Sequence, residues 1–158
     1  MLEQLLTYLR NWFRVRDGVD GKHPGTYTVD GGCIVLPFLQ NGQYFRIIGS
    51  VFNDGLYIYG DHIMDESRNE TELADETFTG SIWALAIPKA VIQAADELGA
   101  VTAQASKITS QIVESPFTAE SFGGYSYSKD QSGQLAALTA QRDEITKRLN
   151  QWRKIRED

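Results

Sequence analysis

Leucine and aromatic residues near the start of the chain recur at helical spacing. They occupy positions 2, 5, 6, 9, 12 and 13. Steps of three and four residues place such side chains on one face, so the pattern predicts an amphipathic helix over residues 2–14 that ends near Asp17-Gly18. Residues 18–25 contain glycine, aspartate and proline with little periodicity, and we expect them to form a loop.

The pattern changes over residues 26–59 to short runs rich in β-branched and aromatic residues. The runs cover residues 26–29, 33–36, 44–48 and 56–59, and Asp-Gly or Asn-Gly pairs separate them. These pairs tolerate the positive φ of tight hairpin turns. Apolar and polar residues alternate within the third run, as a sheet covered on one face requires. We therefore expect an antiparallel β-meander, with a bulge or chain reversal at residues 49–52.

Residues 60–75 are acidic and contain few large apolar residues, which predicts a mobile surface loop. Residues 77–86 favour one more strand, with an alanine-rich helix as the alternative. Pro88 suits the first turn of a helix. An apolar stripe predicts a long helix from there to Val113, in which Gly99 costs about 1 kcal/mol relative to alanine. Ser115-Pro116 ends it, because the residue before proline disfavours the α conformation.

Glycine and aromatic residues gather before the last helix, in the sequence Glu-Ser-Phe-Gly-Gly-Tyr-Ser-Tyr-Ser-Lys from position 120. The glycines permit positive φ or a close backbone approach, and the rings offer large contact areas at low entropic cost. We predict an extended arm over residues 114–131 that contacts another polypeptide. Its main interface residues are Phe122, Gly123, Gly124, Tyr125 and Tyr127.

The last helix is predicted over residues 132–155. One side of it carries Leu135, Leu138, Ile145, Leu149, Trp152 and Ile155. Trp152 and Arg153 are further candidates for a subunit interface. Trp12, Trp83 and Trp152 fall on or near apolar stripes, which favours burial in a core or in a subunit contact. The basic residues from Arg153 onward also complement the negative end of the helix dipole.

Together these elements predict an α+β fold. It consists of a bundle of about three main helices, a small antiparallel meander in the N-terminal half and an extended arm before the C-terminal helix. A chain of 158 residues is expected to form a single domain. Residues 18–86 are its β-rich lobe with the acidic loop 60–75, and residues 1–17 and 87–158 are its helical part with the arm 114–131.

The charge of the chain limits the classes of partner that we expect it to bind. A net charge of −6 and a pI near 4.9 disfavour a dedicated nucleic-acid binder. Acidic residues dominate positions 54–76, whereas basic residues dominate after Arg142. A head-to-tail ring would set one patch against the other, although two solvated faces are the simpler interpretation. The N-terminus lacks the features of a signal peptide, and no apolar run approaches the ~20 residues that span a bilayer.

Candidate chemical groups are few. The one concentration of possible metal ligands is Asp61, His62, Asp65 and Glu66. Their spacing fits no calcium or zinc motif, which favours a solvated loop. Cys33, the single cysteine, lies in an apolar run and is expected to be a buried, inert thiol. No nucleophile elbow, phosphate-binding glycine pattern or paired-carboxylate signature occurs, so we expect no enzymatic activity, cofactor or metal.

The C-terminal half of the sequence contains four distinctive segments. Pro88-Lys89-Ala90 opens a helix, Ser115-Pro116-Phe117 follows, then the arm, and the last helix ends Leu149-Asn150-Gln151-Trp152-Arg153-Lys154-Ile155. Over about 70 residues this order resembles the head-tail connector (adaptor) proteins of tailed bacteriophages and prophages, which commonly have a Glu-Ser-x-Gly-x-Tyr-Ser type segment before a terminal helix. The β-rich residues 26–59 depart from the mostly helical family pattern, which keeps another neck or tail component as an alternative.

The resemblance implies a structural subunit without catalytic activity, one of about a dozen copies in a ring at the phage neck. It implies contacts with itself, with the portal protein and with the next neck or tail protein, and a passage for DNA without sequence-specific binding. It also implies assembly in the bacterial host cytoplasm and a place in the virion. The residues alone leave two other classes open: a ligand- or peptide-binding module built on the β-rich lobe and the turn at residues 49–55, and an enzyme acting near residues 61–66.

Overall fold

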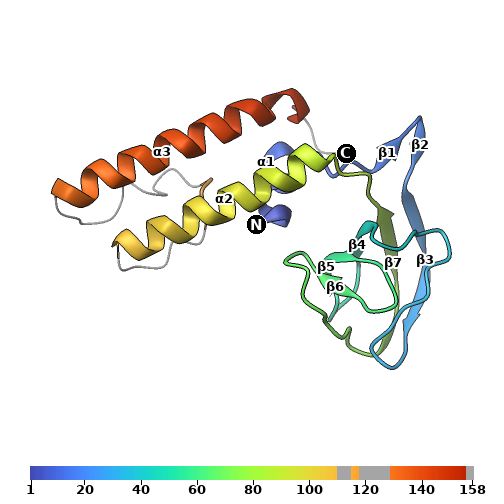
Figure 1. The fold of residues 1–158 in the computed structure, drawn as a ribbon. Coiled ribbons are helices and arrows are strands. Elements are labelled where there is room, and N and C mark those ends of the chain that lie inside the picture. The colour runs from blue at the N-terminus through green and yellow to red at the C-terminus, as the bar shows by residue number, and fades with distance from the viewer. Residues whose placement is uncertain (110–114, 118–128, 156–158) are drawn as a thin grey trace. The chain divides into compact units, whose positions relative to one another are not determined.

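The computed structural model describes residues 1–109, 115–117 and 129–155. Within these residues the fold is α+β, as predicted, with three α-helices, a five-stranded antiparallel sheet and a two-stranded sheet (Figure 1). The chain forms two compact units. Met1–Asn11 and Pro88–Glu157 make the helical unit, and Trp12–Ile87 make the β unit.

Helix α1 covers Leu2–Leu9 and buries its four leucines. It ends at Arg10, whose left-handed backbone (φ 53°, ψ 33°) brings the next amides back onto the helix. The amide of Arg10 donates to Thr7 at 3.1 Å, and that of Asn11 donates to Leu6 at 3.2 Å. These bonds satisfy carbonyls at the helix end. The predicted extension to residue 14 is therefore wrong, and Phe13 also has positive φ (52°).

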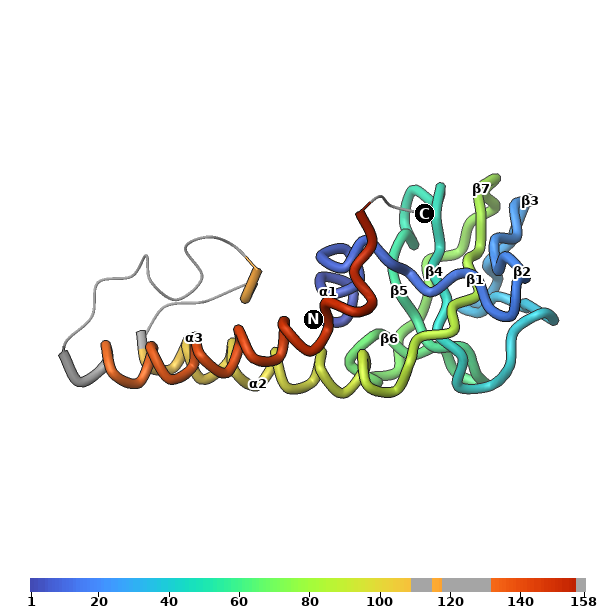
Figure 2. Tube along the Cα trace, turned by 90° about the horizontal axis from the view of Figure 1, so that it is seen from above, coloured from blue at the N-terminus to red at the C-terminus, as the bar shows by residue number. Residues whose placement is uncertain are grey.

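Helices α2 (Lys89–Thr109) and α3 (Lys129–Leu149) run antiparallel and side by side, as Figures 1 and 2 show. The carbonyl of Pro88 accepts from the amides of the first turn of α2, in agreement with the predicted start. Each helix buries an apolar stripe. The buried residues of the pair include Val91, Ala95, Leu98, Val101, Ala105, Leu135, Leu138, Ile145 and Leu149.

Helix α3 begins and ends earlier than predicted. It starts at Lys129, within the segment expected as an arm, and gives way after Leu149 to a 3₁₀ turn, η1 (Asn150–Trp152). Arg153 is extended, and Ile155 is 89% exposed, so it does not continue the apolar stripe. The amide of Lys154 instead donates to the carbonyl of Leu9 at 2.9 Å. The chain leaves the helix because it binds the C-terminal end of α1.

The five-stranded sheet has the order β3-β7-β4-β5-β6 and is antiparallel throughout. Its strands are β3 (Lys22–Val29), β7 (Glu76–Ala84), β4 (Tyr44–Ile48), β5 (Gly55–Ile58) and β6 (Met64–Asp65). Strands β4, β5 and β6 form the meander, while β7 lies between β3 and β4 and joins β3 to the meander. The chain reverses after Gly49, which has φ +88°, in line with the sequence pattern.

Residues 18–25 do not form the predicted loop. Strands β1 (Val15–Arg16) and β2 (Val19–Asp20) make a hairpin around Asp17 and Gly18, both with positive φ. Strand β3 then begins at Lys22 and contains Pro24. A proline is tolerated there because β3 is an edge strand. Where the chain leaves the β unit, the amide of Ala86 donates to the carbonyl of Phe13, near the point where the chain enters it, at 2.8 Å.

The core of the β unit covers one face of the sheet. Its members include Phe45, Ile47, Phe78 and Ile82 from the strands and Ile34, Leu36, Leu39, Ile63 and Leu73 from the connections. The run 33–36 is thus an irregular covering segment and not a strand, with a single bridge at Cys33. Residues 60–75 contribute Ile63 and Leu73 to this core and contain β6. The expected surface loop is a packed part of the fold, because its few apolar residues are buried.

Candidate interaction site

The turn between β4 and β5 is closed by its own side chains. Asn53 is 2% exposed; its Nδ2 donates to the carbonyl of Ala74 at 2.8 Å and to Oε1 of Glu76 at 2.9 Å. Its Oδ1 accepts from the amide of Ala74 at 2.8 Å. Ser50 Oγ accepts from the amide of Asn53 at 2.7 Å and also bonds to Glu76. The space considered as a ligand cradle is therefore filled from within.

Two large apolar side chains project from this turn. Val51 is 84% exposed and Phe52 is 70% exposed. The amide of the preceding Ser50 donates to Oδ1 of Asp54 at 2.9 Å, which closes the turn beneath them. Turns are usually polar, so an exposed Val-Phe pair held on an ordered turn indicates a contact surface. We call Val51 and Phe52 the apolar tip.

A groove lies in the helical unit between the first turns of α2 and the end of α3. Ala90 and Ala94 line it on α2, and Leu149 and the half-buried Trp152 line it on the other side. Its volume is about 300 Å³. Small alanine side chains opposite a tryptophan leave this hollow. We call it the Trp152 groove.

A salt bridge borders the Trp152 groove. Arg148 Nη2 lies 2.6 Å from Glu97 Oε2, and both side chains line the groove. The same two residues line a second hollow of about 410 Å³ farther along α2 and α3, with Val101, Gln104 and Ile145 among its walls. The pair is about half exposed, so it contributes little to stability and mainly sets the charge at the rim.

Arg153, the other C-terminal candidate, is engaged within its own chain. Its Cζ lies 4.6 Å from the ring centroid of Tyr8. Arg10 Nη1 donates to the carbonyl of Ile155 at 2.7 Å, and Asn11 Nδ2 donates to that of Trp152 at 3.0 Å. The residues after α3 are thus fastened to α1. Arg153 is the C-terminal cap of η1, and its amide donates to the carbonyl of Asn150.

The residues just before the predicted arm are also anchored to the helical unit. Phe117 stacks on Tyr8 with ring centroids 4.7 Å apart and planes 11° apart. Pro116 is buried, and its carbonyl accepts from Arg142 Nη1 at 3.4 Å. The predicted interface residues of the arm lie outside the described residues: Phe122, Gly123, Gly124, Tyr125 and Tyr127.

The tryptophans of the β unit join two arginines. Trp12 is buried and meets the half-buried Trp83 edge to face, with centroids 6.3 Å apart. Arg46 Cζ lies 3.8 Å from the Trp12 centroid, and Arg14 Cζ lies 4.8 Å from that of Trp83. The predicted burial is confirmed for Trp12. These contacts stabilise the unit as cation–π interactions and form no open aromatic surface for a sugar.

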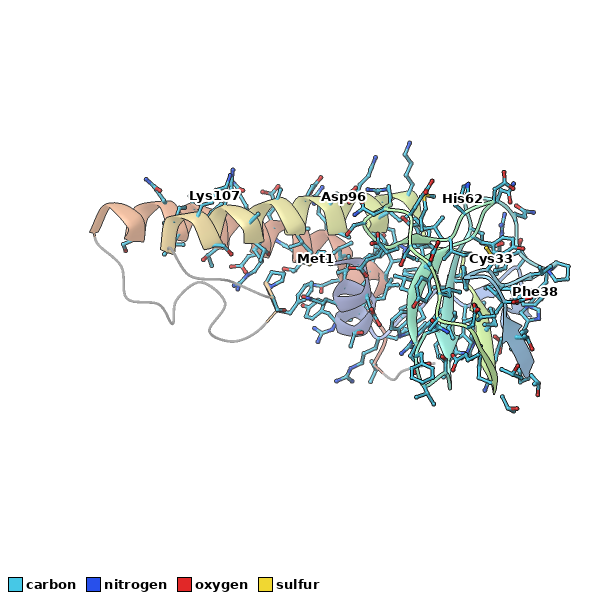
Figure 3. All side chains as sticks on the ribbon, turned by 90° about the horizontal axis from the view of Figure 1, so that it is seen from below. Met1, Cys33, Phe38, His62, Asp96 and Lys107 are labelled. Carbon is cyan, nitrogen blue, oxygen red and sulfur yellow. The ribbon has the colours of Figure 1, made fainter. Side chains whose placement is uncertain are left out.

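The chemical candidates are not brought together. Among the described residues no three histidine, cysteine or acidic side chains are placed to hold a metal ion. Cys33 is exposed, so the expectation of a buried thiol is wrong. In its run only the alternate residues Ile34 and Leu36 are buried, and Cys33 lies on the exposed side. It lines a pocket of about 280 Å³ with His62 and Glu70, on the side of the β unit seen in Figure 3. Asp65 is used structurally, since its Oδ1 accepts from the amides of Ser67 and Asn69.

The apolar tip and the Trp152 groove contain residues that the sequence did not single out. The signal for the tip was a Val-Phe pair among glycine, asparagine and aspartate, where turn chemistry gives no reason for large apolar residues. The groove left no such signal, because Ala90 and Ala94 read as ordinary members of an alanine-rich helix.

None of the described helices is both long and apolar enough to cross a membrane. The chain was also compared with protein-family models, with curated proteins and with solved structures, and none of the three comparisons found a match.

Proposed function

We propose that this protein is a structural subunit of the head-tail connector of a tailed bacteriophage. Copies assemble into a ring at the neck, between the portal protein and the next neck or tail protein, and DNA passes through the ring. The protein is made in the host cytoplasm and remains in the virion. Its work is assembly, without catalysis or a bound cofactor.

One observation carries the proposal: two antiparallel helices of 21 residues each bracket the glycine-aromatic segment in the sequence. The chain on one side of that segment is fixed to the helical unit through Pro116 and Phe117. Anchored flanks and a segment rich in tyrosine and glycine suit a contact with a neighbouring polypeptide. This arrangement supports the resemblance to connector proteins, which rests on the same residues.

Charge supports the same function. Residues 12–87 contain five basic and eleven acidic residues, a formal charge of −6 that equals that of the whole chain. The remainder carries ten of each sign. An acidic lining repels DNA phosphates, so DNA passes along it without adhering. Surfaces of unlike charge on one subunit also favour contacts between different faces of neighbouring copies.

The direct test is to image the purified protein, alone and mixed with the portal protein of the same genome. We expect closed rings on the portal by electron microscopy. A protein that forms no ring and does not bind the portal would contradict the function.

Replacing Tyr125 and Tyr127 with alanine should abolish ring formation or portal binding, because the arm loses its two largest amphipathic rings. The matched control is Ser126→Ala with Ser128→Ala, which alters the same segment without removing an aromatic ring. Circular dichroism should show the same helix content for both variants. Assembly of the tyrosine variant that matches wild type by sedimentation would exclude the arm as the interface.

A further inference from the structure

We propose that the apolar tip of one copy docks into the Trp152 groove of a second copy of this chain, an interface that goes beyond the proposed function and relies on it only for the assembly of copies. The tip belongs to the β unit and the groove to the helical unit. Each copy therefore offers one of each surface.

The tip is prepared for insertion. Val51 and Phe52 are 84% and 70% exposed, while the turn that carries them is closed by the bonds of Ser50 to Asp54 and of Asn53 to Ser50. A turn that is already ordered loses little conformational freedom when it binds. Aromatic side chains on such turns are typical anchors that fill a pocket on the partner.

The Trp152 groove has the chemistry to receive an apolar anchor. Ala90 and Ala94 give it small apolar side chains on α2, and Leu149 and Trp152 lie on the other side. The rest of its lining is polar and consists of Gln93, Glu97, Arg148 and Gln151. Its volume of about 300 Å³ gives room for side chains of the size of phenylalanine and valine. Trp152 adds a broad ring face, against which another aromatic ring packs favourably.

The charges of the two surfaces are complementary. Asp54, next to the tip, is exposed, and the β unit around it carries the whole net charge of the chain. The first turn of α2, at one end of the groove, has no acidic residue, so the positive end of the helix dipole is uncompensated there. At the rim, the charge of Arg148 is balanced by its salt bridge to Glu97. The acidic tip is therefore attracted to this end of the groove, whereas acidic surfaces of the partner repel it.

A second copy is the occupant that these features favour, because both complementary surfaces are encoded in one chain. Contacts between different surfaces of identical subunits repeat from copy to copy and close as a ring when the rotation permits. Salt should weaken such a contact, since part of the attraction is electrostatic.

The test is sedimentation velocity of the full chain over a range of concentrations. Val51→Ser with Phe52→Ser removes the tip, and Ala90→Glu places a charge in the groove at an exposed helix position. Matched controls are Val35→Ser, a residue that is 82% exposed elsewhere on the β unit, and Ala103→Glu, an exposed alanine of α2 outside the groove. We expect the first two variants to self-associate at least about tenfold more weakly than wild type, and the controls to match wild type.

Mixing the variants gives a sharper result. A tip variant still has its groove and a groove variant still has its tip, so an equimolar mixture should form a dimer through one intact contact and grow no further. Wild type that remains monomeric at every concentration, or variants that all associate like wild type, would overturn the interface. Rings that persist in both variants and fail only with the Tyr125 and Tyr127 substitutions would overturn it while leaving the proposed function in place.

Discussion

Asn53 shows how one buried amide can hold an exposed turn in place. It links the turn after β4 to the start of β7 through Ala74 and Glu76, and all three of its side-chain bonds are 2.8 or 2.9 Å long. The exposure of the apolar tip depends on this inner hydrogen bonding. A polar residue in the middle of a turn is thus a core residue here.

We predict that Asn53→Ala lowers the free energy of unfolding by roughly 2–3 kcal/mol, because it removes the three hydrogen bonds that this buried side chain makes to Ala74 and Glu76. Urea denaturation followed by circular dichroism measures the change. Asn41→Ala, at an exposed turn position, is the control and should stay within about 0.5 kcal/mol of wild type. Similar losses for both variants would show that the bonds of Asn53 are not what holds the turn.

Asp20 carries a pH dependence of known sign. Desolvation alone would raise its pKa, but hydrogen bonds from Arg14 and the Lys22 amide, with the charges of both residues, together hold the pKa below its usual value of 3.8. Arg14 Nε lies 2.7 Å from Asp20 Oδ1. A lowered pKa in the folded state means that the carboxylate contributes stability above pH 3.8 and loses it as the pH falls through the folded pKa.

Carbon NMR titration of the Asp20 carboxyl should therefore give a midpoint below 3.8, and Arg14→Gln should raise that midpoint. Arg16→Gln is the matched control, because Arg16 pairs with Asp17 and both side chains are largely exposed. An Asp20 midpoint that responds equally to both substitutions would contradict a specific role for Arg14.

At the scale of elements, strands β4 and β7 approach unusually closely where Gly80 faces the end of β4. A Cβ at Gly80 would collide with the carbonyl oxygen of Ile48 and would lie 3.2 Å from the Cα of Gly49. Neither obstacle is a flexible side chain, so the strands must move apart to admit it. The glycine lets β7 pair closely with β4.

Gly80→Ala should therefore destabilise the protein by about 2 kcal/mol or more. The same substitution at Gly133, on α3 with no atom within 4 Å of an added Cβ, should stabilise it by up to about 1 kcal/mol. Thermal unfolding of the two variants measures this difference in sign. Two changes of the same sign would mean that the backbone contact at Gly80 is not limiting.

Elements set by local patterns were predictable from the sequence, and elements set by distant partners were not. Strand β4, the start of α2 and the turns at Asp-Gly and Asn-Gly follow from alternation, proline and glycine. The early end of α1 does not, because it depends on a left-handed Arg10 and on a chain end that binds the carbonyl of Leu9. Residues 60–75 were misjudged because just two apolar residues, Ile63 and Leu73, hold them on the core.

The same distinction holds for the interaction site. The sequence shows the tip as two large apolar residues within a turn. The ordered conformation that exposes them depends on a bond between Asn53 and Glu76, which are 23 positions apart and meet only in the folded chain. The Trp152 groove depends on the pairing of α2 with the end of α3. No local pattern encodes a hollow between two helices that are far apart in sequence.

At the scale of the whole molecule, charge and architecture divide at the same places in the chain. Residues 12–87, the β unit, hold the entire formal charge of −6, and the rest of the chain is neutral, with ten residues of each sign. Assembly through surfaces on both units would make each neighbouring pair combine an acidic part with a neutral one. The two units of the chain thus differ in both charge and architecture.

The bond between the Ala86 amide and the Phe13 carbonyl ties together the places where the chain enters and leaves the β unit. A segment whose two ends meet can be inserted, removed or exchanged as one piece without changing the path of the rest of the chain. Residues 12–87 are such a segment.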